Sequence, residues 1–397
     1  MRKNMNILFV THYPDLYGAN LSLCNVAAEL KRKYGVKVFV LCLSSKGDAL
    51  KEYLNREKIE VKFLRFYNTT YAIGNIKDHI KAYVASLLNE IEIGKLDDFI
   101  KKNQIDLIHT NTMATLVGAQ LARKYDIPHI WHLREFLEED YACTQINNTI
   151  FKKVSDYTAQ FIAISNSVKS KYIERLGTDK IKVVYNGIPQ LTRSINNIQE
   201  SNNVSNKTIF GIVGVIRKEK GTLEAIKAFL NLDHNIFPNC ELWVIGGGIE
   251  NLSDEYIKEI QRVVKESAFG NKVKFWGYRT DISELLDQID VGLVCSKLEA
   301  FGRITIEYMM KEVLVIGANS GGTAELINDG VTGRLYEVGN IVDLNRKMTE
   351  CLDGSINVQI LKKNAKTFSE NFTIDKCVNN IYEIYEKVLY AKNAKIR

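Results

Sequence analysis

The chain has 397 residues, of which 46% are hydrophobic and 25% charged, and its net charge is +6. These proportions are those of soluble globular domains, and they exclude a collagen-like or intrinsically disordered chain. The length predicts two domains. The seven cysteines are scattered and none is spaced as C-x-x-C, so neither a disulfide framework nor a zinc site is expected. This usage favours a reducing cytosol.

The amino terminus carries Arg2 and Lys3, but the apolar run that follows, ILFV, is too short for the core of a signal peptide. No stretch approaches the ~20 apolar residues of a membrane-spanning helix. We therefore expect a cytoplasmic protein, soluble or at most peripheral to the inner face of the cell membrane.

Charge is distributed unevenly along the chain. Residues 1–190 carry 27 Lys and Arg against 20 Asp and Glu, whereas the remainder carries 26 against 27. One interpretation is a solvated basic surface. The other is that the first half faces an anionic partner, such as phospholipid headgroups or a lipid diphosphate. No nucleic-acid partner is expected.

Short runs rich in β-branched residues alternate with longer amphipathic segments, which is typical of βαβ units and a parallel sheet. In the first half, strands are predicted at 6–12, 37–43, 60–66, 106–112, 129–135, 161–165 and 181–187. In the second half, strands are predicted at 208–216, 241–247, 273–278, 291–296 and 313–318. Each half is therefore expected to be a doubly wound α/β domain.

The segment 189–207 is rich in Asn and Ser and lacks apolar periodicity, which indicates a linker. We therefore expect one domain at 1–188, a second domain at 208–370, and a terminal helix at 371–397. That helix carries a Val/Ile/Tyr/Leu stripe, and we expect it to pack back across the domain junction.

Ligands of open α/β sheets bind at the carboxyl ends of strands, so the loops there are the candidate sites. After the first strand, Gly18 opens a helix and allows a ligand to approach its N–H groups, although by itself the pattern favours a plain structural turn. Gly246 begins a Gly-Gly-Gly run after another strand. Neither loop has the spacing G-x-G-x-x-G, so a dinucleotide-dependent dehydrogenase is not supported.

A third loop carries Arg217, Lys218 and Lys220 directly before Gly221 and a helix. Cations beside helix-start N–H groups make a site for a diphosphate. Because cations at a helix start oppose the helix dipole, a functional reason for Lys220 is favoured over a merely solvated surface.

The stretch CSKLEAFGRITIEYMMKE at 295–312 places Glu299 in a loop after a strand and Glu307 near the start of a helix. Phe301 and Gly302 form the turn between them. Two carboxylates at the mouth of a cleft suit a polyol such as a sugar or a ribose. Taken alone, two solvated glutamates near a helix start would explain the spacing as well.

The spacing does not stand alone. Together with the segment 319–340, the blocks IAISNSV at 162–168 and VVYNGI at 183–188, and KEKG at 218–221, it resembles the retaining glycosyltransferases of family 4. That family has the GT-B fold, in which two Rossmann-like domains face each other across a cleft. The resemblance spans nearly the whole chain and extends to bacterial enzymes of capsule and surface polysaccharide assembly.

The resemblance implies that the domain at 1–188 binds the acceptor and the domain at 208–370 binds the nucleotide-sugar donor. It also implies roles for the residues that match the donor side of the family pattern. Glu307 would bind the nucleotide ribose, Glu299 would contact the donor sugar, and Lys220 would neutralise the diphosphate. N–H groups near Phe301 and Gly302, and at Gly18, would assist Lys220, and Gly246 would allow close approach. Where the family commonly has an arginine, this chain has Val215, and Arg217 would substitute from two residues further on.

On the acceptor side, many members have a His-Asp or His-Glu pair in the fifth strand. This chain offers Arg134 and Glu135 there, with His132 two residues earlier. Arg134 is accordingly a catalytic candidate, and His132, Glu135 and Asn186 are acceptor-site candidates.

The reaction that the resemblance implies is sugar transfer from a UDP- or GDP-linked donor, with retention at the anomeric carbon, to a saccharide or lipid-linked saccharide. No D-x-D motif occurs in the chain, so a metal is not expected to be required and no other cofactor is predicted. Two alternatives stay open. One is a non-catalytic partner subunit, and the other is an epimerase-like or phosphorylase-like enzyme on a similar fold.

Overall fold

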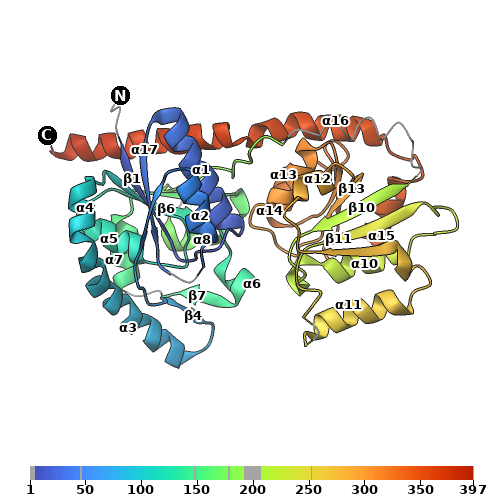
Figure 1. Ribbon diagram of the computed structural model, residues 1–397, viewed down its shortest axis with the longest axis horizontal. Coiled ribbons are helices and arrows are strands. Elements are labelled where there is room, and N and C mark those ends of the chain that lie inside the picture. Colours follow the sequence, from blue (N-terminus) through green and yellow to red (C-terminus); the bar gives the residue numbers. More distant parts are fainter. Residues whose placement is uncertain are drawn as a thin grey trace. The chain divides into compact units, whose positions relative to one another are not determined.

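The structure is a computed structural model that describes residues 5–44, 47–146, 149–177, 179–191, 207–251 and 253–396. The chain forms two compact units (Figure 1): Met1–Pro189 with Phe372–Arg397, and Gln190–Asn371. We call them the N-terminal unit and the C-terminal unit. Of the expected linker at 189–207, residues 192–206 lie outside the described residues.

The N-terminal unit is built on a seven-stranded parallel sheet of order β3-β2-β1-β5-β6-β8-β9. Its strands are β1 (Asn6–Thr11), β2 (Lys37–Cys42), β3 (Glu60–Phe63), β5 (Leu107–Thr110), β6 (His129–Leu133), β8 (Gln160–Ala163) and β9 (Ile181–Val183). A parallel sheet is buried on both faces, and β1 shows this directly. Ile7 and Phe9 belong to one core cluster, whereas Leu8 and Val10 belong to the cluster on the opposite face.

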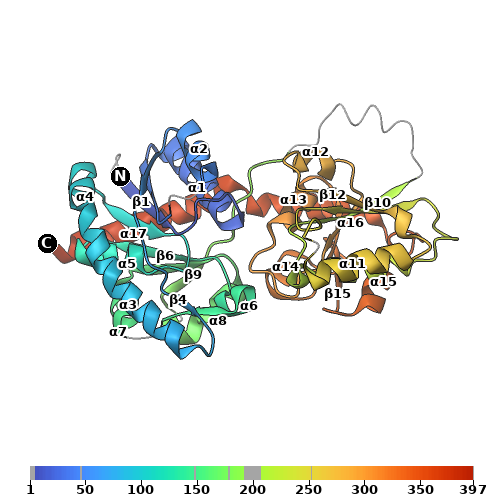
Figure 2. The same cartoon turned by 60° about the horizontal axis from the view of Figure 1, so that its bottom comes forward.

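Helices cover both faces of this sheet (Figures 1 and 2). They are α1 (Gly18–Tyr34), α2 (Ala49–Arg56), α3 (Ile76–Glu92), α4 (Asp97–Asn103), α5 (Val117–Lys124), α6 (Leu137–Tyr141), α7 (Thr149–Tyr157), α8 (Asn166–Leu176) and α17 (Ile374–Ile396). A short antiparallel pair, β4 (Thr70–Ala72) with β7 (Cys143–Gln145), lies outside the main sheet. No described helix is long and apolar enough to cross a membrane.

The expected terminal helix is α17, and it belongs to the N-terminal unit. It enters the unit beside the segment after β9, where Ile188 N–H donates to Phe372 O and Ile374 N–H donates to Ile188 O. A Cβ on Gly187 would lie 2.5 Å from the Cα of Ile374, so glycine is needed for this approach. Val378 of α17 then packs with α1 in the core.

The C-terminal unit contains a six-stranded parallel sheet of order β12-β11-β10-β13-β14-β15. Its strands are β10 (Thr208–Val213), β11 (Cys240–Ile245), β12 (Val273–Gly277), β13 (Val291–Val294), β14 (Leu314–Ala318) and β15 (Arg334–Tyr336). Its helices are α10 (Thr222–Leu230), α11 (Glu255–Glu266), α12 (Ile282–Leu286), α13 (Arg303–Met310), α14 (Gly321–Leu326), α15 (Ile341–Glu350) and α16 (Val358–Ser369). Two parallel-sheet α/β domains are therefore present, as the strand pattern predicted.

Candidate functional site

In each sheet the chain order reverses between two central strands, β1 and β5 in one and β10 and β13 in the other. Such switch points are where open parallel sheets bind ligands, beyond the carboxyl ends of the strands. Lys220 follows β10, Glu299 follows β13, and Gly18 follows β1. Arg134 follows β6, which is the neighbour of β5. The fold thus brings the predicted residues of each unit to its switch point.

The loop after β10 lies tightly against the end of β13. It forms a short 3-10 turn, Lys218–Lys220, and Gly221 closes it with φ of 68°. A Cβ on Gly221 would lie 2.2 Å from the carbonyl oxygen of Cys295, so only glycine fits. The N–H of Lys297 donates to the carbonyl of Glu219 at 3.0 Å. The two switch-point loops are therefore joined through their backbones.

Lys220 and Glu299, which were predicted separately to contact a ligand, form an ion pair with each other. The Nζ of Lys220 lies 2.8 Å from Oε2 of Glu299, and the side chains are 42% and 21% exposed. A half-exposed pair of this kind contributes little to stability, so an incoming anion can displace the carboxylate at small cost. Arg217, two residues before the turn, is exposed to solvent.

The start of α13 follows the loop that carries Glu299. Gly302 precedes it with φ of 90°, and no side chain caps this end of the helix. Uncapped N–H groups at a helix start attract anions. Phe301 is buried beneath the turn, and Glu307 forms an ion pair with Arg303 at 3.2 Å one helical turn earlier.

The position of Glu307 is fixed by the residue that follows it. The ring of Tyr308 fills the space above Gly292 of β13, where a Cβ would lie 2.5 Å from the ring. The Oη of Tyr308 donates to the carbonyl of Gly211 in β10 at 2.9 Å. Because this anchor crosses both switch-point strands, it sets the rotation of α13 about its own axis.

A third loop, between β14 and α14, holds the backbone around Glu299. The N–H of Gly322 donates to the carbonyl of Glu299 at 2.6 Å, and Ser320 Oγ donates to the carbonyl of Lys297 at 2.6 Å. A Cβ on Gly322 would lie 2.7 Å from the Cα of Phe301. The carboxylate of Glu299 is thus carried by a backbone fixed from two sides.

Gly246 contributes through close packing of the loops. It follows β11 with φ of 153°, and a Cβ there would lie 1.9 Å from the carbonyl oxygen of Gly214. The conformation and the contact both require glycine. Its backbone therefore lies against the loop that carries Arg217.

Two hydroxyl groups near Gly302 were not singled out by the sequence. Oγ1 of Thr305 and Oγ1 of Thr323 are buried and have no hydrogen-bond partner among the described residues. Both lie within 4 Å of the place that a Cβ on Gly302 would take. Buried hydroxyls are normally hydrogen-bonded, so these two are candidates for contacts with a ligand.

In the N-terminal unit the candidate residues form a buried polar network around Arg134. Its Nε donates to Oδ1 of Asn111 at 2.7 Å, and Nη1 donates to Oδ1 of Asn186 at 2.6 Å. Its Nη2 lies 3.3 Å from Nδ1 of His132. The Arg134 side chain is therefore held in one orientation by three elements of the unit.

This network also fixes the protons on two histidines. Burial lowers the pKa of His132 and of His109 well below the usual value, so both rings are neutral. A guanidinium can only donate, so Nδ1 of His132 accepts and its proton lies on Nε2. Nε2 of His109, at 3.1 Å from that Nδ1, must then be a donor, and Nδ1 of His109 accepts from the Oη of Tyr385 at 2.5 Å.

Nε2 of His132 is buried and has no hydrogen-bond partner within the described part of the chain. It therefore presents an N–H donor and cannot act as a base in this protonation state. Tyr385, which makes the last hydrogen bond of this series, comes from α17, far from the histidines in sequence.

Glu135 lies next to this network and is held by a different set of groups. Its Oε1 accepts a hydrogen bond from the Oγ1 of Thr112 and another from the N–H of Met113, the latter at 2.7 Å. Burial raises the pKa of this carboxyl to about 7, against the effect of those hydrogen bonds. Glu135 therefore changes charge near neutral pH.

The loop after β1 is connected to the same network. Oγ1 of Thr11 donates to Asn20 at 2.6 Å, and Asn20 in turn donates to two carbonyls of the loop. Nδ2 of Asn111 donates to the carbonyl of Ala19 at 3.1 Å. Gly18 has open space where a Cβ would be, so the start of α1 is accessible.

Two models of known protein families match the chain, one in each half. The family model of glycosyl transferases group 1 matches residues 194–368, and that of glycosyltransferase family 4 matches residues 17–190. The chain is a group 1, family 4 glycosyltransferase. Its two α/β units are the two domains of the GT-B fold.

Relatives of this glycosyltransferase cover between about half and nearly all of its length. An uncharacterized glycosyltransferase of Methanocaldococcus jannaschii is 26% identical over 95% of this chain and 96% of its own. The lipopolysaccharide 1,2-N-acetylglucosaminetransferase of Salmonella typhimurium is 27% identical over 52% of this chain and 57% of its own. The crystal structure of Anabaena HepE in complex with UDP is 23% identical, with a TM-score of 0.78 over 96% of this chain and 100% of that chain.

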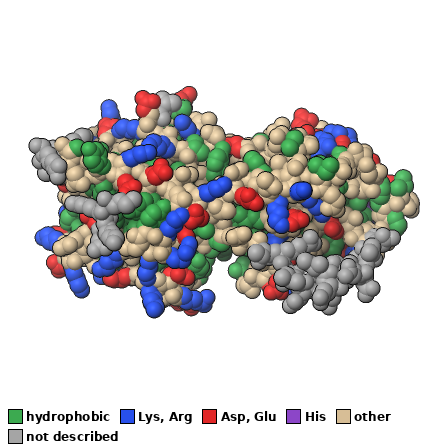
Figure 3. All heavy atoms as spheres, turned by 90° about the horizontal axis from the view of Figure 1, so that it is seen from above, with side chains coloured by type: hydrophobic (Ala, Val, Ile, Leu, Met, Phe, Trp, Pro, Cys, Tyr) green, Lys and Arg blue, Asp and Glu red, His purple; other side chains and the backbone are tan. Residues whose placement is uncertain are grey.

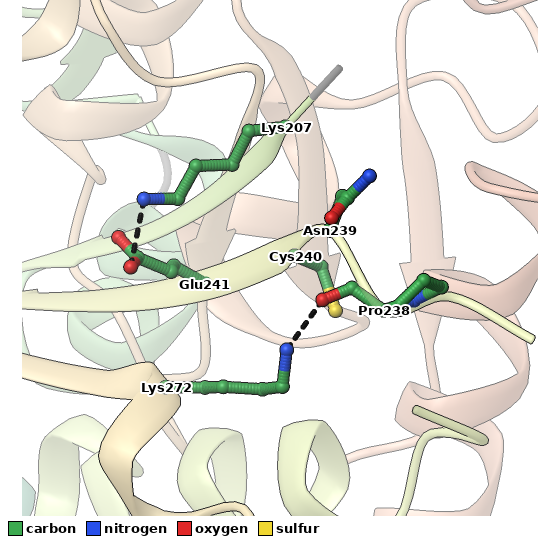
Figure 4. Close-up of a pocket in the computed structure, with 6 residues that line it drawn as sticks. All are labelled: Lys207, Pro238, Asn239, Cys240, Glu241 and Lys272. Atoms are coloured by element: carbon green, nitrogen blue, oxygen red, sulfur yellow. Dashed lines mark hydrogen bonds and ion pairs between the residues drawn. The ribbon is translucent and has the colours of Figure 1, made fainter. Parts of the chain in front are cut away.

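One pocket of the C-terminal unit lies away from its switch point. At the opposite, amino-terminal edge of the C-terminal sheet, a pocket is lined by Lys207, Pro238, Asn239, Cys240, Glu241 and Lys272 (Figure 4). Lys207 pairs there with Glu241 at 2.7 Å, and Lys272 donates to the carbonyl of Pro238. On the face that Figure 3 shows, basic and acidic side chains are interspersed.

Proposed function

We propose that this glycosyltransferase moves a sugar from a nucleoside diphosphate sugar to a lipid-linked saccharide in surface polysaccharide biosynthesis, with retention and without a metal ion. The observation that carries the donor assignment is the ion pair of Lys220 with Glu299 between two switch-point loops. The Anabaena relative, crystallised with UDP, and the Salmonella relative, named for lipopolysaccharide, support the donor and the acceptor class.

In this proposal, the diphosphate takes the place of Glu299 beside Lys220. The ammonium of Lys220 and the uncapped start of α13 then stabilise the charge that develops on the leaving diphosphate. Glu299, released from its partner, accepts hydrogen bonds from hydroxyls of the donor sugar. Arg217, exposed on the same loop, adds a second cation.

Glu307 accepts hydrogen bonds from the ribose in this proposal. It is oriented by the anchor of Tyr308, and its ion pair with Arg303 is only partly buried. Because Glu307 contacts the nucleoside and Glu299 the sugar, loss of each carboxylate has a different signature.

The N-terminal unit supplies the groups for the acceptor side. Nε2–H of His132 donates to a substrate oxygen, and Glu135 and Asn186 contribute oxygens that accept from hydroxyls. Arg134 holds His132 and Asn186 in place. Such a fixed array costs no reorganisation when the substrate binds.

Calorimetry of UDP and GDP, together with transfer rates over a panel of nucleotide sugars, tests the donor scheme. Glu307→Gln should weaken both the free nucleoside diphosphate and the intact donor. Glu299→Gln should leave the affinity for the nucleoside diphosphate nearly unchanged and lower turnover, because this carboxylate contacts only the donor sugar. Equal nucleotide affinity in the wild type and Glu307→Gln would contradict the ribose assignment.

Three further readouts address the rest of the proposal. The NMR spectrum of the product should show the anomeric configuration of the donor, and an inverted product would exclude a retaining reaction. Transfer should survive EDTA. If nucleotide sugars bind but none is transferred to any acceptor, the chain is a non-catalytic subunit instead.

A further inference from the structure

Helix α3 presents its large apolar side chains to solvent and its small or polar ones to the protein. Its buried residues are Ala82, Ala85, Ser86 and Asn89. Its exposed residues include Ile76, Ile80, Val84, Leu87, Leu88 and Ile91, with 36–77% of each side chain accessible. This is the reverse of an ordinary surface helix, which turns its apolar stripe to the core. The helix runs along the outside of the N-terminal unit (Figure 2).

Hydrogen bonds on the inner face hold α3 in this orientation. Asn89 accepts from the N–H of Tyr67 at 2.8 Å and donates to the carbonyl of the same residue at 2.9 Å. Gln120 of α5 donates to the carbonyl of Ser86 at 2.8 Å and to Glu90 at 3.0 Å. A half turn of the helix would break all of these contacts, so the apolar face is fixed outward.

The charged residues of α3 are also divided unequally between solvent and the rest of the unit. The only charged residues among its exposed positions are Lys77 and Lys81. Its three acids interact within the chain: Asp78 with Lys81 at 3.0 Å, Glu90 with Arg123 at 3.5 Å, and Glu92 with Lys95 at 2.7 Å. The outward face is therefore apolar and basic. The whole N-terminal unit has 32 Lys and Arg against 23 Asp and Glu, a net charge of +9.

The width of the apolar face helps to choose its occupant. Viewed down the helix at about 100° per residue, the apolar stripe has Tyr83 at one edge and Leu88 at the other. It covers about 140° of the helix circumference. A seam between two helices is narrower than this. A broad, convex apolar strip with both lysines along its Leu88 side fits a deformable surface of acyl chains under anionic headgroups.

We propose that the outward face of α3 docks the enzyme on an anionic lipid bilayer, with Ile80 and Leu87 inserted among the acyl chains and Lys77 and Lys81 at the headgroups. The turn before the helix extends this face, because Ile73 is also exposed. Docking places the N-terminal unit at the surface where a lipid-linked acceptor would lie. The inference does not depend on the reaction, because its readout involves neither donor nor acceptor.

Vesicle co-sedimentation of the full chain tests the proposal. Wild type should bind phosphatidylcholine vesicles that contain phosphatidylglycerol more tightly than pure phosphatidylcholine vesicles, and less tightly at high salt. Ile80→Glu combined with Leu87→Glu should weaken this binding at least about tenfold, since two apolar anchors are lost. Lys77→Glu with Lys81→Glu should remove the preference for phosphatidylglycerol.

The matched control is Val342→Glu on α15, because Val342 is as exposed (78%) as Ile76 (77%) but lies in the C-terminal unit. It should bind vesicles like wild type, and all variants should keep the wild-type melting curve and UDP affinity. Binding that is indifferent to both α3 variants would overturn the proposal. So would light scattering in which wild type self-associates, the α3 variants are monomeric and no form binds vesicles, since a second copy would then cover the face.

Discussion

The candidate groups in the two units are held in opposite ways. In the N-terminal unit, Arg134 and His132 are buried and each bond of the network is made within the protein. In the C-terminal unit, Lys220 and Glu299 are partly exposed and joined to each other, on loops whose shape depends on glycine. The first arrangement is ready before a substrate arrives. The second has to exchange an internal partner for a ligand.

This difference matches the chemistry proposed for each side. Neutral hydroxyls are distinguished by fixed donors and acceptors, which a buried network supplies. A diphosphate is attracted by charge and by backbone N–H groups, which need only be accessible. Substitutions in the network should therefore act on stability as well as activity, and substitutions in the loops mainly on activity.

The largest effect on stability is expected for Arg134→Met. The change removes the donor to Asn111, Asn186 and His132. It leaves the two buried amide oxygens unpaired, whereas Nδ1 of His132 keeps the bond from His109. At ~1–3 kcal/mol for each lost partner, the free energy of unfolding should fall by about 4 kcal/mol. Urea titration measures this, with the exposed Arg123→Met as control. A loss equal to that of the control would contradict the network.

Lys220→Ala should show the converse pattern. Turnover should fall by a factor of about 10² to 10³, because one donor to the leaving diphosphate is lost. The free energy of unfolding should change by less than about 1 kcal/mol, since the pair with Glu299 is partly exposed. Lys218→Ala, from the same turn, is the matched control for both assays. Similar turnover in the two variants would remove Lys220 from the proposed site.

Glu135→Gln tests the buried carboxyl through the pH dependence of stability. In the wild type the folded-state pKa is raised from 4.5 to about 7, so the unfolded chain releases this proton first as pH rises. The folded state thus loses about 2–3 kcal/mol between those pH values relative to the variant, and the difference is constant above and below them. Urea titrations across this range measure it, and Glu174→Gln on α8 is the control. Parallel curves for wild type and Glu135→Gln would show that Glu135 is not buried in this way.

Tyr385→Phe should have the smallest effect, about 1 kcal/mol, because it removes one hydroxyl from the network. Its signature is spectroscopic. Without the donor, Nδ1 of His109 has no partner, and the ¹⁵N shifts of both imidazoles should move. Tyr390→Phe, exposed on the same helix, should leave them unchanged. If the ¹⁵N shifts are also unchanged in Tyr385→Phe, the assigned tautomers are wrong.

Much of the fold could be predicted because the strands are apolar and short. All twelve predicted strands are present, and the structure ends most of them one to four residues earlier. The strands that were missed, β4, β7 and β15, have three residues each. A run of that length carries no periodicity, and its pairing depends on distant partners.

The site was predicted as separate residues, and their contacts were not. Spacing alone could not show that Lys220 meets Glu299 79 residues later, or that Tyr385 reaches His109 276 residues earlier. The apolar stripe of α3 indicates a helix but gives no sign of which side faces the core. The orientation of α3 depends on hydrogen bonds of Asn89 and Gln120, and the sequence does not show which groups these two side chains contact.

Helix α17 has a consequence for how the enzyme is made. Val378, Ile381 and Tyr385 complete the core of a domain whose other residues leave the ribosome almost 200 residues earlier. The C-terminal unit is contiguous in sequence and can therefore fold first. The N-terminal unit keeps part of its core exposed until α17 has been translated. A chain truncated before α17 should therefore be incompletely folded in its N-terminal unit, which is far in sequence from the missing segment.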